Sequence, residues 1–316
     1  MAVVSAIGIA VIYLPQPIQL MVAAEFGVPV EASAGATVAI LAGYALGIIL
    51  LVPLGDRFPV RRQVPVQLAV TALAITGAAL APGWLPFILL CFVAGATTIV
   101  AQLLVASALR VAPPAVRART AAILAGSFIL GLFTVRAGMG AAAELFGWRA
   151  VLIASAAVVL LCIPLALAAP AETHAARPAY GSLLLSIPGI VRRSPVLVLM
   201  TLAHACAFSA FIAVWSLTTV WAVTRLGLTD GQAALLSLAG LAAGAATIAF
   251  APVHPRLGVR LALIATLLVL VAGCVVLLAA PDVIPLVVAG LFLVSFGLSS
   301  SQVSTQASAL AAVEPA

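Results

Sequence analysis

The side chain with the clearest chemical potential is a lone arginine inside an apolar stretch. Arg136 follows Ile129–Val135, which carries no charge, and precedes Ala137–Ala143, which carries none either. An arginine in the middle of a membrane-spanning helix costs about 2.5 to 3.5 kcal/mol on insertion scales. We therefore expect Arg136 to face a polar cavity, where it could attract an anionic group. The alternative is that it extends outward to the interface or binds a neighbouring carbonyl.

Neutral polar residues gather in four other apolar stretches and suit recognition better than reaction. They are Tyr13, Gln16 and Gln19, then Thr97, Thr98 and Gln102, then Thr201 and His204, and finally Ser299–Gln302. These groups could line a mixed apolar and hydrogen-bonding pocket, although Ser, Thr and Gln also hold membrane helices together. His204 could titrate near neutral pH, and its alternative role is a hydrogen-bond donor in helix packing.

The sequence offers no candidate group for catalysis or metal binding. Neither HExxH nor a phosphate-binding loop occurs, and Glu25 and Glu144 stand near the outer ends of their stretches. Direct proton coupling through a carboxylate at the membrane centre therefore has no candidate. Four cysteines lie singly, without metal-ligand spacing: Cys91, Cys162, Cys206 and Cys274. We expect no metal, no cofactor and no enzymatic activity, and an integral-membrane enzyme is the alternative that lacks a nucleophile.

The composition is typical of a membrane protein. Hydrophobic residues make up 65% of the 316 residues and charged residues 7%, whereas soluble domains carry about 25% charged residues. One helical crossing needs about 20 mostly apolar residues, so the chain could hold about ten to twelve. The net charge of +6 comes from arginines in short loops, without the aromatic residues that accompany single-strand binding. The predicted partners are the lipid bilayer and a small molecule, and nucleic acid is not among them.

Loops divide the chain into ten predicted transmembrane helices, which makes it an all-α polytopic membrane protein. The predicted spans are residues 2–24, 32–54, 64–81, 85–109, 119–142, 148–169, 195–221, 232–253, 261–280 and 284–309. The first could be mistaken for a signal peptide, but it lacks a basic start and contains Pro15 and Pro17. We therefore predict that it is a helix of the mature protein.

Arginines are divided unequally between the two sides of the predicted membrane. The loops after the second, fourth, sixth and eighth spans contain eleven of the fourteen, whereas the opposite loops contain only Arg149 and Arg225. Because short cytoplasmic loops retain basic residues, the arginine-rich side is predicted to be cytoplasmic, as are both ends of this chain. Trp84, Trp148 and Trp221 then lie near the outer face.

An internal repeat appears at an offset of about 197 to 200 residues. The matched segments are EFGV (25–28) with RLGL (225–228), AGYALG (42–47) with AGLAAG (239–244), and RFPVR (57–61) with RLGVR (256–260). Two parallel halves place a binding site near the membrane midplane between them. The predicted divisions are a six-helix half at residues 1–169, a cytoplasmic linker at 170–194 and an incomplete four-helix half at 195–316.

The charged turn after the second span has two explanations. Arg57, Arg61 and Arg62 complement the negative end of the preceding helix and hold the loop inside, so topology alone could account for them. Asp56 is harder to explain in this way, because a carboxylate beside a negative helix end is unfavourable unless a cation faces it.

On these residues the chain resembles the major facilitator superfamily of membrane transporters. The turn PLGDRFPVRR (53–62) is similar to the family signature GxLaDRxGRR between helices two and three, and RLGVR is similar to its degraded second copy. YLPQP (13–17), AGYALG and GWR (147–149) resemble the bacterial efflux-type branch, which includes drug–proton antiporters. Three residues depart from the family pattern. Pro53 and Pro59 stand where the family has Gly, and Cys91 stands where many proton-coupled members have Arg.

The resemblance implies a fold of two parallel halves that moves a small molecule by alternating access, as an exporter in the cell inner membrane. The implied gating residues are Asp56, Arg57, Arg61, Arg62, Arg256 and Arg260. The implied substrate cavity contains Tyr13, Gln16, Gln102, Arg136, His204 and Gln302. We expect an anionic or amphipathic substrate, and the sequence leaves proton coupling open.

The repeat also predicts that ten of twelve expected helices are present. At the repeat offset Ala316 lies opposite Arg117, which precedes the fifth span of the first half. The chain is therefore expected to be a fragment or a ten-helix variant, and a truncated fragment that does not transport is an alternative to a working exporter.

Overall fold

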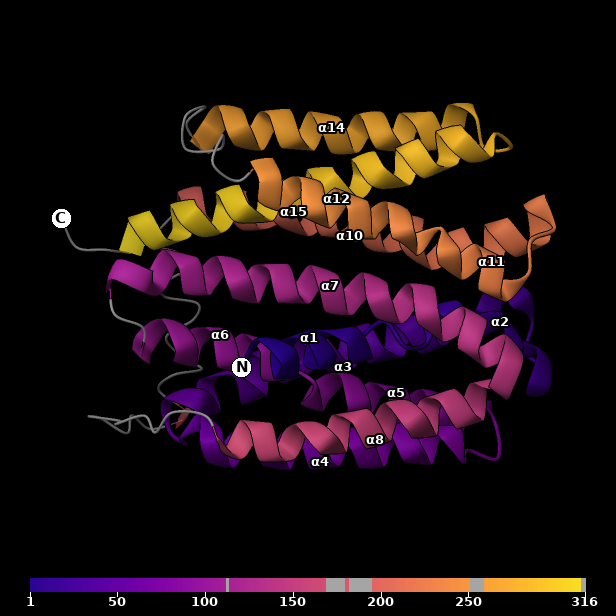
Figure 1. Cartoon of the computed structure of the whole chain (residues 1–316), viewed down its shortest axis with the longest axis horizontal. Coiled ribbons are helices and arrows are strands. Elements are labelled where there is room, and N and C mark those ends of the chain that lie inside the picture. The colour runs from indigo at the N-terminus through magenta and orange to yellow at the C-terminus, as the bar shows by residue number, and fades with distance from the viewer. Residues whose placement is uncertain (112–113, 169–179, 182–194, 251–258, 314–316) are drawn as a thin grey trace. The chain divides into compact units, whose positions relative to one another are not determined.

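The computed structural model describes residues 1–111, 114–168, 180–181, 195–250 and 259–313, and the described residues are helical apart from short turns (Figure 1). The earlier helices are α1 (Ala2–Val11), η1 (Gln16–Ile18), α2 (Gln19–Glu25), η2 (Val30–Ala32), α3 (Gly35–Leu51), η3 (Pro53–Asp56), α4 (Val60–Ala79), α5 (Trp84–Thr97), α6 (Val100–Val111), α7 (Pro114–Phe146) and α8 (Trp148–Leu167). The later helices are α10 (Pro195–Leu226), α11 (Asp230–Leu235), α12 (Ser237–Phe250), α14 (Val259–Ala279) and α15 (Ile284–Val313). The predicted all-α class is confirmed.

Seven helical segments of the described chain are long and apolar enough to cross a membrane: Ala2–Glu25, Val30–Gly55, Trp84–Ala108, Trp148–Leu167, Val198–Leu226, Arg260–Ala279 and Ile284–Gln302. The other three predicted spans are helical but more polar or interrupted. In α4, for example, the helix begins at Val60 and so includes Arg61 and Arg62, which the sequence prediction placed in the preceding loop.

The chain divides into two compact units. Unit 1 contains Met1–Ser186 together with Leu228–Leu235, and unit 2 contains Ile187–Gly227 together with Leu236–Ala316. The short helix α11 therefore belongs to unit 1, although it follows α10 in the chain. Both units contain the same turn, since Gly27 (φ 64°) and Gly227 (φ 67°) each follow a helix in the left-handed conformation that glycine adopts without strain.

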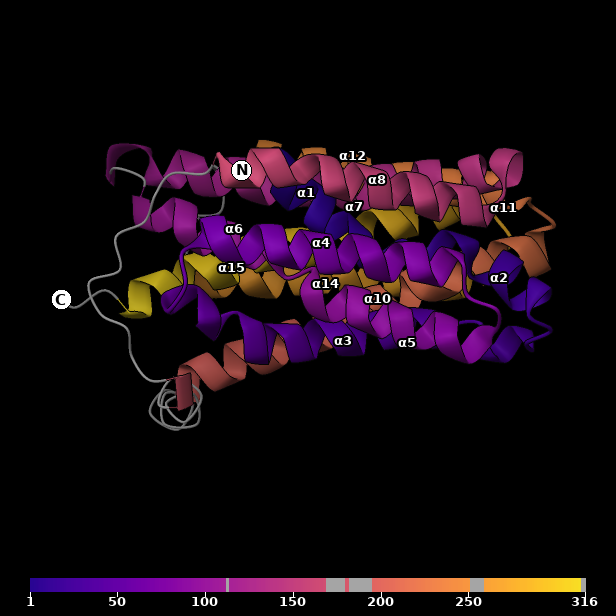
Figure 2. The same ribbon diagram turned by 90° about the horizontal axis from the view of Figure 1, so that it is seen from below.

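Unit 1 is held together by helix pairs whose backbones approach closely. Its main pairs are α3 with α5, α4 with α8, and α1 with α7; α4 and α8 lie side by side in Figure 1, and α3 and α5 in Figure 2. A Cβ on Gly43 would overlap the carbonyl group of Phe92, and one on Gly95 would overlap that of Ile40. Small residues at such points allow membrane helices to pack without a gap.

Unit 2 is built around α15, which packs against α14, α12 and α10. Close approach again depends on glycine, because a Cβ on Gly273 would lie 2.7 Å from the backbone nitrogen of Val294. Trp215 is buried in this unit and donates a hydrogen bond from its indole nitrogen to Ser295 Oγ at 3.1 Å. The indole polar group is therefore satisfied inside an apolar environment.

Three spans that the sequence predicted as continuous are interrupted. The first span breaks between Val11 and Gln16, the fourth between Thr97 and Val100, and the eighth at Leu236. Pro15 and Pro17 explain the first break, because proline has no N–H to donate and its ring clashes with the preceding turn. At the second break the hydroxyl of Thr98 donates to the carbonyl of Gly8 at 2.6 Å, so the irregular backbone is tied to the first span.

Candidate functional site

The break in the first span is the most unusual feature of unit 1. Residues 12–19 are all buried, and within them lie a prolyl turn and the three-residue helix η1. Irregular backbone at membrane depth is tolerated where it is buried in protein or lines a cavity. In transporters such unwound segments are where substrates and coupling ions bind.

Arg136 lies on the helix that packs against this break. α7 contacts both α1 and η1, and Arg136 itself is 2% exposed. It interacts electrostatically with Tyr13, which is 4% exposed. Gln16 is fully buried on η1. The structure therefore places three of the predicted cavity residues in the same part of unit 1, with Arg136 directed inward.

A second pair of polar residues extends this arrangement. Gln102 on α6 donates a hydrogen bond to the phenol oxygen of Tyr44 on α3, and Tyr44 interacts electrostatically with Tyr13. Tyr13, Tyr44, Gln102 and Arg136 thus form a connected set, which we call the polar cluster. The cluster draws one residue from each of the first, second, fourth and fifth spans.

Tyr44 was not among the residues that the sequence prediction selected. It lies in the AGYALG segment, which the sequence analysis used for the repeat and for the family resemblance but not for the cavity. A phenol in an otherwise apolar span is the signal that could have identified it, since a buried tyrosine hydroxyl usually finds a hydrogen-bond partner.

The polar cluster is suited to binding rather than to covalent chemistry. It offers one guanidinium, two phenols and one amide, all of which can donate hydrogen bonds to an anion. Among the described residues, no group of three His, Cys, Asp or Glu side chains could hold a metal ion. The arrangement can therefore recognise an anionic group next to apolar surface from α1 and α3.

Two predicted cavity residues belong to unit 2. His204 on α10 is half-buried, with its ring stacked on Phe208 at a centroid distance of 6.4 Å. Gln302 on α15 is exposed. Their participation in a common site with the polar cluster stays a prediction.

The described residues among those predicted to form the gate are exposed. The guanidinium of Arg57 lies over the ring of Phe58 at 5.9 Å, Arg62 and Arg260 are exposed, and Arg256 lies outside the described residues. Asp56 ends η3, and its side chain is also outside the described part.

Arg61 has a definite role within unit 1. Its Nε donates a hydrogen bond to the carbonyl oxygen of Leu167, at the carboxyl end of α8, at 2.8 Å. Nearby, Gln63 Nε2 donates to the carbonyl of Leu51, the last residue of α3, at 2.6 Å. Cations and donors near a helix carboxyl end satisfy its free carbonyl groups. Arg61 and Gln63 therefore fasten the carboxyl ends of α8 and α3 to the start of α4.

The opposite end of unit 1 contains an ionic network that the sequence did not reveal. Arg149 donates from Nη2 to Glu25 Oε1 at 2.7 Å and from Nη1 to the carbonyl of Ala79. Trp148 donates from Nε1 to Glu25 Oε2 at 2.6 Å. The Arg149 guanidinium lies 4.4 Å from the centre of the Trp148 ring. The network joins the ends of α2 and α4 to the start of α8.

The short helix α11 is attached to α7 by a carboxylate. Glu144 Oε1 accepts a hydrogen bond from the Gly231 backbone N–H at 2.8 Å, and a Cβ on Gly140 would lie 2.6 Å from the Cβ of Ala234. Asp230 stands beside Glu144. Burial, and then the charge of Glu144, raise the pKa of Asp230 above its usual range. Asp230 therefore binds a proton more readily when α11 is packed against α7 than when α11 is detached.

We predict that acidification strengthens this attachment. Because the pKa of Asp230 is raised when α11 is seated, seating is most favourable below about pH 4, the ordinary value for Asp, and weakens as pH rises through the raised value. Besides Glu144, the charged residues on the elements packed against α11 are Arg117, Arg119 and Arg136, all on α7. Thiol labelling of Ala233→Cys, which is buried, should increase with pH relative to Leu235→Cys, which is exposed on the same helix.

The substitution Asp230→Asn provides the control for that measurement. An amide cannot titrate, so the ratio of the two labelling rates should become independent of pH. A ratio that varies equally with pH in Asp230→Asn would show that Asp230 does not control the attachment.

Comparison with known proteins is consistent with this architecture. The probable transporter SCO4007 of Streptomyces coelicolor is 33% identical over 246 residues, which is 77% of this chain and 57% of that protein. A bacterial homologue of the human lysosomal transporter Spinster, in an inward-facing and unoccupied conformation, matches with a TM-score of 0.74 and 14% identity over 99% of this chain and 74% of its own. The human organic anion transporter MFSD10 (TETRAN) matches with a TM-score of 0.67 and 20% identity over 98% and 85%.

These similarities point to a transporter rather than an enzyme. The chain spans just over half the length of the Streptomyces relative, and the two solved structures share its helical fold. The sequence profile described as Major Facilitator Superfamily matches residues 1–316. By sequence and by fold, the chain belongs to the Major Facilitator Superfamily.

Proposed function

We propose that this chain forms part of a secondary transporter that exports a small anionic or amphipathic molecule across the bacterial inner membrane by alternating access. The observation that carries the proposal is the burial of Arg136 on the helix beside the interrupted first span, where it interacts electrostatically with Tyr13. A guanidinium held inside a membrane protein can form charge-assisted hydrogen bonds with an anionic group, and these bonds are stronger than those between neutral groups.

The neighbouring groups suit such a substrate. Tyr44 and Gln102 add hydrogen-bonding groups, while the walls of the surrounding helices are apolar, so a molecule with one anionic end and one apolar part fits the surroundings. One structurally similar protein is named as an organic anion transporter, which makes organic anions the first probes to test. In this proposal His204 and Gln302 complete the cavity from the second half.

The remaining features of the proposal concern orientation and gating. The arginine-rich loops make both ends of this chain cytoplasmic, with the repeated halves at residues 1–169 and 195–316. Two loops then form the cytoplasmic gate. One contains Asp56, Arg57, Arg61 and Arg62, and the other contains Arg256 and Arg260. Export, antiport and the use of a proton gradient are parts of the proposal that flux measurements must decide.

The test is a binding and flux assay in proteoliposomes with an organic anion, a neutral analogue of the same size and a cationic analogue. Arg136→Gln should weaken binding of the anion about tenfold, the value of one charge-assisted hydrogen bond of about 1.4 kcal/mol, and leave the neutral analogue unaffected. Arg136→Lys should keep part of the anion affinity, because it retains the charge without the forked geometry.

Binding measured by tryptophan fluorescence separates the site from the transport cycle. Arg225→Gln is the matched control, since Arg225 is an exposed arginine of unit 2. If Arg136→Gln and the original chain bind all three probes alike, Arg136 has no role in recognition. If binding persists but no flux is detected in either direction, the site stands and the chain alone does not transport.

A further inference from the structure

One side of α4 carries a row of polar side chains inside unit 1. The row consists of Gln63, Gln67 and Thr71, which follow one another at intervals of four residues and so lie on one side of the helix. We call them the α4 row. Gln67 is 5% exposed and Thr71 is 1% exposed. The row belongs to the third span, which contributes no residue to the polar cluster.

The α4 row faces α5 and α6, the two helices of the interrupted fourth span. At its far end, Thr71 Oγ1 lies 2.7 Å from Thr97 Oγ1, beside the break. At its near end, a Cβ on Gly55 would lie 2.7 Å from Leu103 Cδ2, on α6, and 3.7 Å from Gln63 Oε1. The row therefore leads from the charged turn (residues 53–62) to the break, over about 12 Å of helix.

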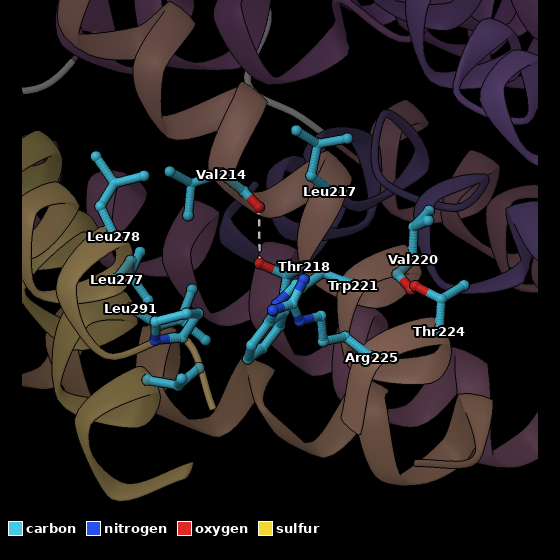
Figure 3. A pocket seen from close by; sticks show the side chains of 12 residues that line it. Val214, Leu217, Thr218, Val220, Trp221, Thr224, Arg225, Leu277, Leu278 and Leu291 are labelled. Carbon is cyan, nitrogen blue, oxygen red and sulfur yellow. Dashed lines mark hydrogen bonds between the residues drawn. The ribbon is translucent and has the colours of Figure 1, made fainter. Parts of the chain in front are cut away.

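Two oxygen atoms of the row are buried and have no hydrogen-bond partner among the described residues: Gln63 Oε1 and Gln67 Oε1. The amide nitrogen of Gln63 is already bound to the carbonyl of Leu51. A buried hydroxyl can donate to its own helix, as Thr218 does to the carbonyl of Val214 at 2.7 Å in the apolar groove of unit 2 (Figure 3). An amide oxygen only accepts, so it needs a donor from elsewhere.

Thr71 adds a third acceptor to the row. The hydroxyl of Thr97 donates to the carbonyl oxygen of Val93 at 3.0 Å. In the pair of threonines the donor is therefore Thr71, because the hydrogen of Thr97 is already used. The oxygen of Thr71 can still accept a hydrogen bond. The row thus presents three acceptors in succession along one side of α4.

Water is the molecule that fits between these acceptors. Side chains four residues apart on a helix are about 5 to 6 Å apart. A water molecule that donates one O–H to each of two neighbours, at about 2.8 Å, spans about 5.6 Å. All three side chains are neutral, and a cation inside a membrane protein is costly without a compensating charge. Water is neutral, and it commonly binds buried polar groups that have no other partner.

We propose that the α4 row binds a chain of water molecules, one between Gln63 and Gln67 and the next between Gln67 and Thr71. The chain brings water from the charged turn to the break of the fourth span, where the backbone hydrogen bonds of the helix are interrupted. It is a hydrated path inside unit 1, separate from the polar cluster. The proposal does not depend on the transported substrate.

The first test measures the reactivity of a thiol one turn beyond Gln67. In the full chain the native cysteines are replaced by alanine, and Thr71→Cys is treated with 2-aminoethyl methanethiosulfonate. This reagent attacks the thiolate, which forms readily only where water reaches the sulfur. We expect Thr71→Cys to react about tenfold faster than Ala72→Cys, which is 2% exposed and points to a different side of α4.

The substitution Gln67→Met tests whether the amide holds the water. Methionine has a similar length but lacks a strong hydrogen-bonding group. It should slow the reaction of Thr71→Cys about tenfold and leave that of Ala72→Cys unchanged. The proposal is overturned if Thr71→Cys reacts as slowly as Ala72→Cys, or equally fast with Gln67 and with Gln67→Met.

A second readout uses the original chain and covers the case in which Thr71→Cys does not fold. X-ray radiolysis converts bound water into hydroxyl radicals, which oxidise the side chains next to it. Leu103, which shares a neighbour with Gln63 Oε1, is 2% exposed, and Leu152, in a small apolar cavity, is 4% exposed. Apolar cavities stay dry, so we expect at least about threefold more oxidation of Leu103. Equal oxidation of the two leucines would show that the row is dry.

Discussion

Gly131→Ala should disrupt unit 1, because the added Cβ would overlap the backbone carbonyl of Ala6 on α1. A carbonyl group of a neighbouring helix cannot move aside as a flexible side chain can, so α7 must shift away from α1. Overpacking of this kind costs about 3 kcal/mol, the upper part of the usual range. We expect a large loss of folded protein in detergent, measured by gel filtration, and loss of anion binding because Arg136 moves with α7.

Gly138→Ala is the matched control on the same helix. No atom lies within 4 Å of the position that its Cβ would occupy, and an alanine favours a helix over glycine by about 1 kcal/mol. The protein with Gly138→Ala should therefore fold at least as well as the original chain. If both substitutions lowered the folded yield equally, the contact between α7 and α1 would not be the cause.

Arg149→Ala should destabilise unit 1, at the end where α2, α4 and α8 meet, by about 2 kcal/mol. The substitution removes hydrogen bonds to Glu25 and to the carbonyls of Ala79 and Ala81 and leaves Glu25 with Trp148 as its remaining donor. Bonds to charged groups contribute about 1.5 to 3 kcal/mol each, and partial exposure of this pair reduces that sum. For a chain of this size we expect Tm to fall by about 3 °C.

Arg225→Ala is the control, because it removes an arginine that forms an ion pair outside any such network. Arg225 occupies the equivalent position to Glu25 in the repeat, and its ion pair with Asp282 is almost two-thirds exposed on both sides. Exposed pairs contribute less than about 1 kcal/mol, so Tm should change by no more than about 2 °C. A fall in Tm as large as that of Arg149→Ala would contradict the assignment of Arg149 as the centre of a network.

The sequence predicted the positions of the helices well because hydropathy and loop charge depend on local composition. It did not predict the break at Thr98, since the one proline of the fourth span, Pro86, lies in the first turn of α5 and its one glycine, Gly95, lies inside the same helix. The break is stabilised by a bond to Gly8, ninety residues away in the chain. Pro15 and Pro17 did signal a break, but they served only as an argument against a signal peptide.

The candidate site could be predicted only in part for the same reason. Arg136 was identifiable because a charge in an apolar stretch is conspicuous. Its association with Tyr13 and the pairing of Tyr44 with Gln102 join residues far apart in the chain, and periodicity carries no information about such contacts. The network of Glu25 and Arg149 was missed because these residues, too, are far apart in the chain, although both were predicted to lie on the outer side.

The helix α7 has a mechanical consequence for the molecule. It contains 33 residues without a break, which corresponds to a rod about 50 Å long, whereas the hydrocarbon core is about 30 Å thick. The first and fourth spans beside it are interrupted. On the proposed function, we expect a displacement at Arg136 to be transmitted along α7 toward Glu144 and α11, about 12 Å away. The interrupted spans lack a continuous ladder of helix hydrogen bonds at their breaks, so we expect them to bend there instead.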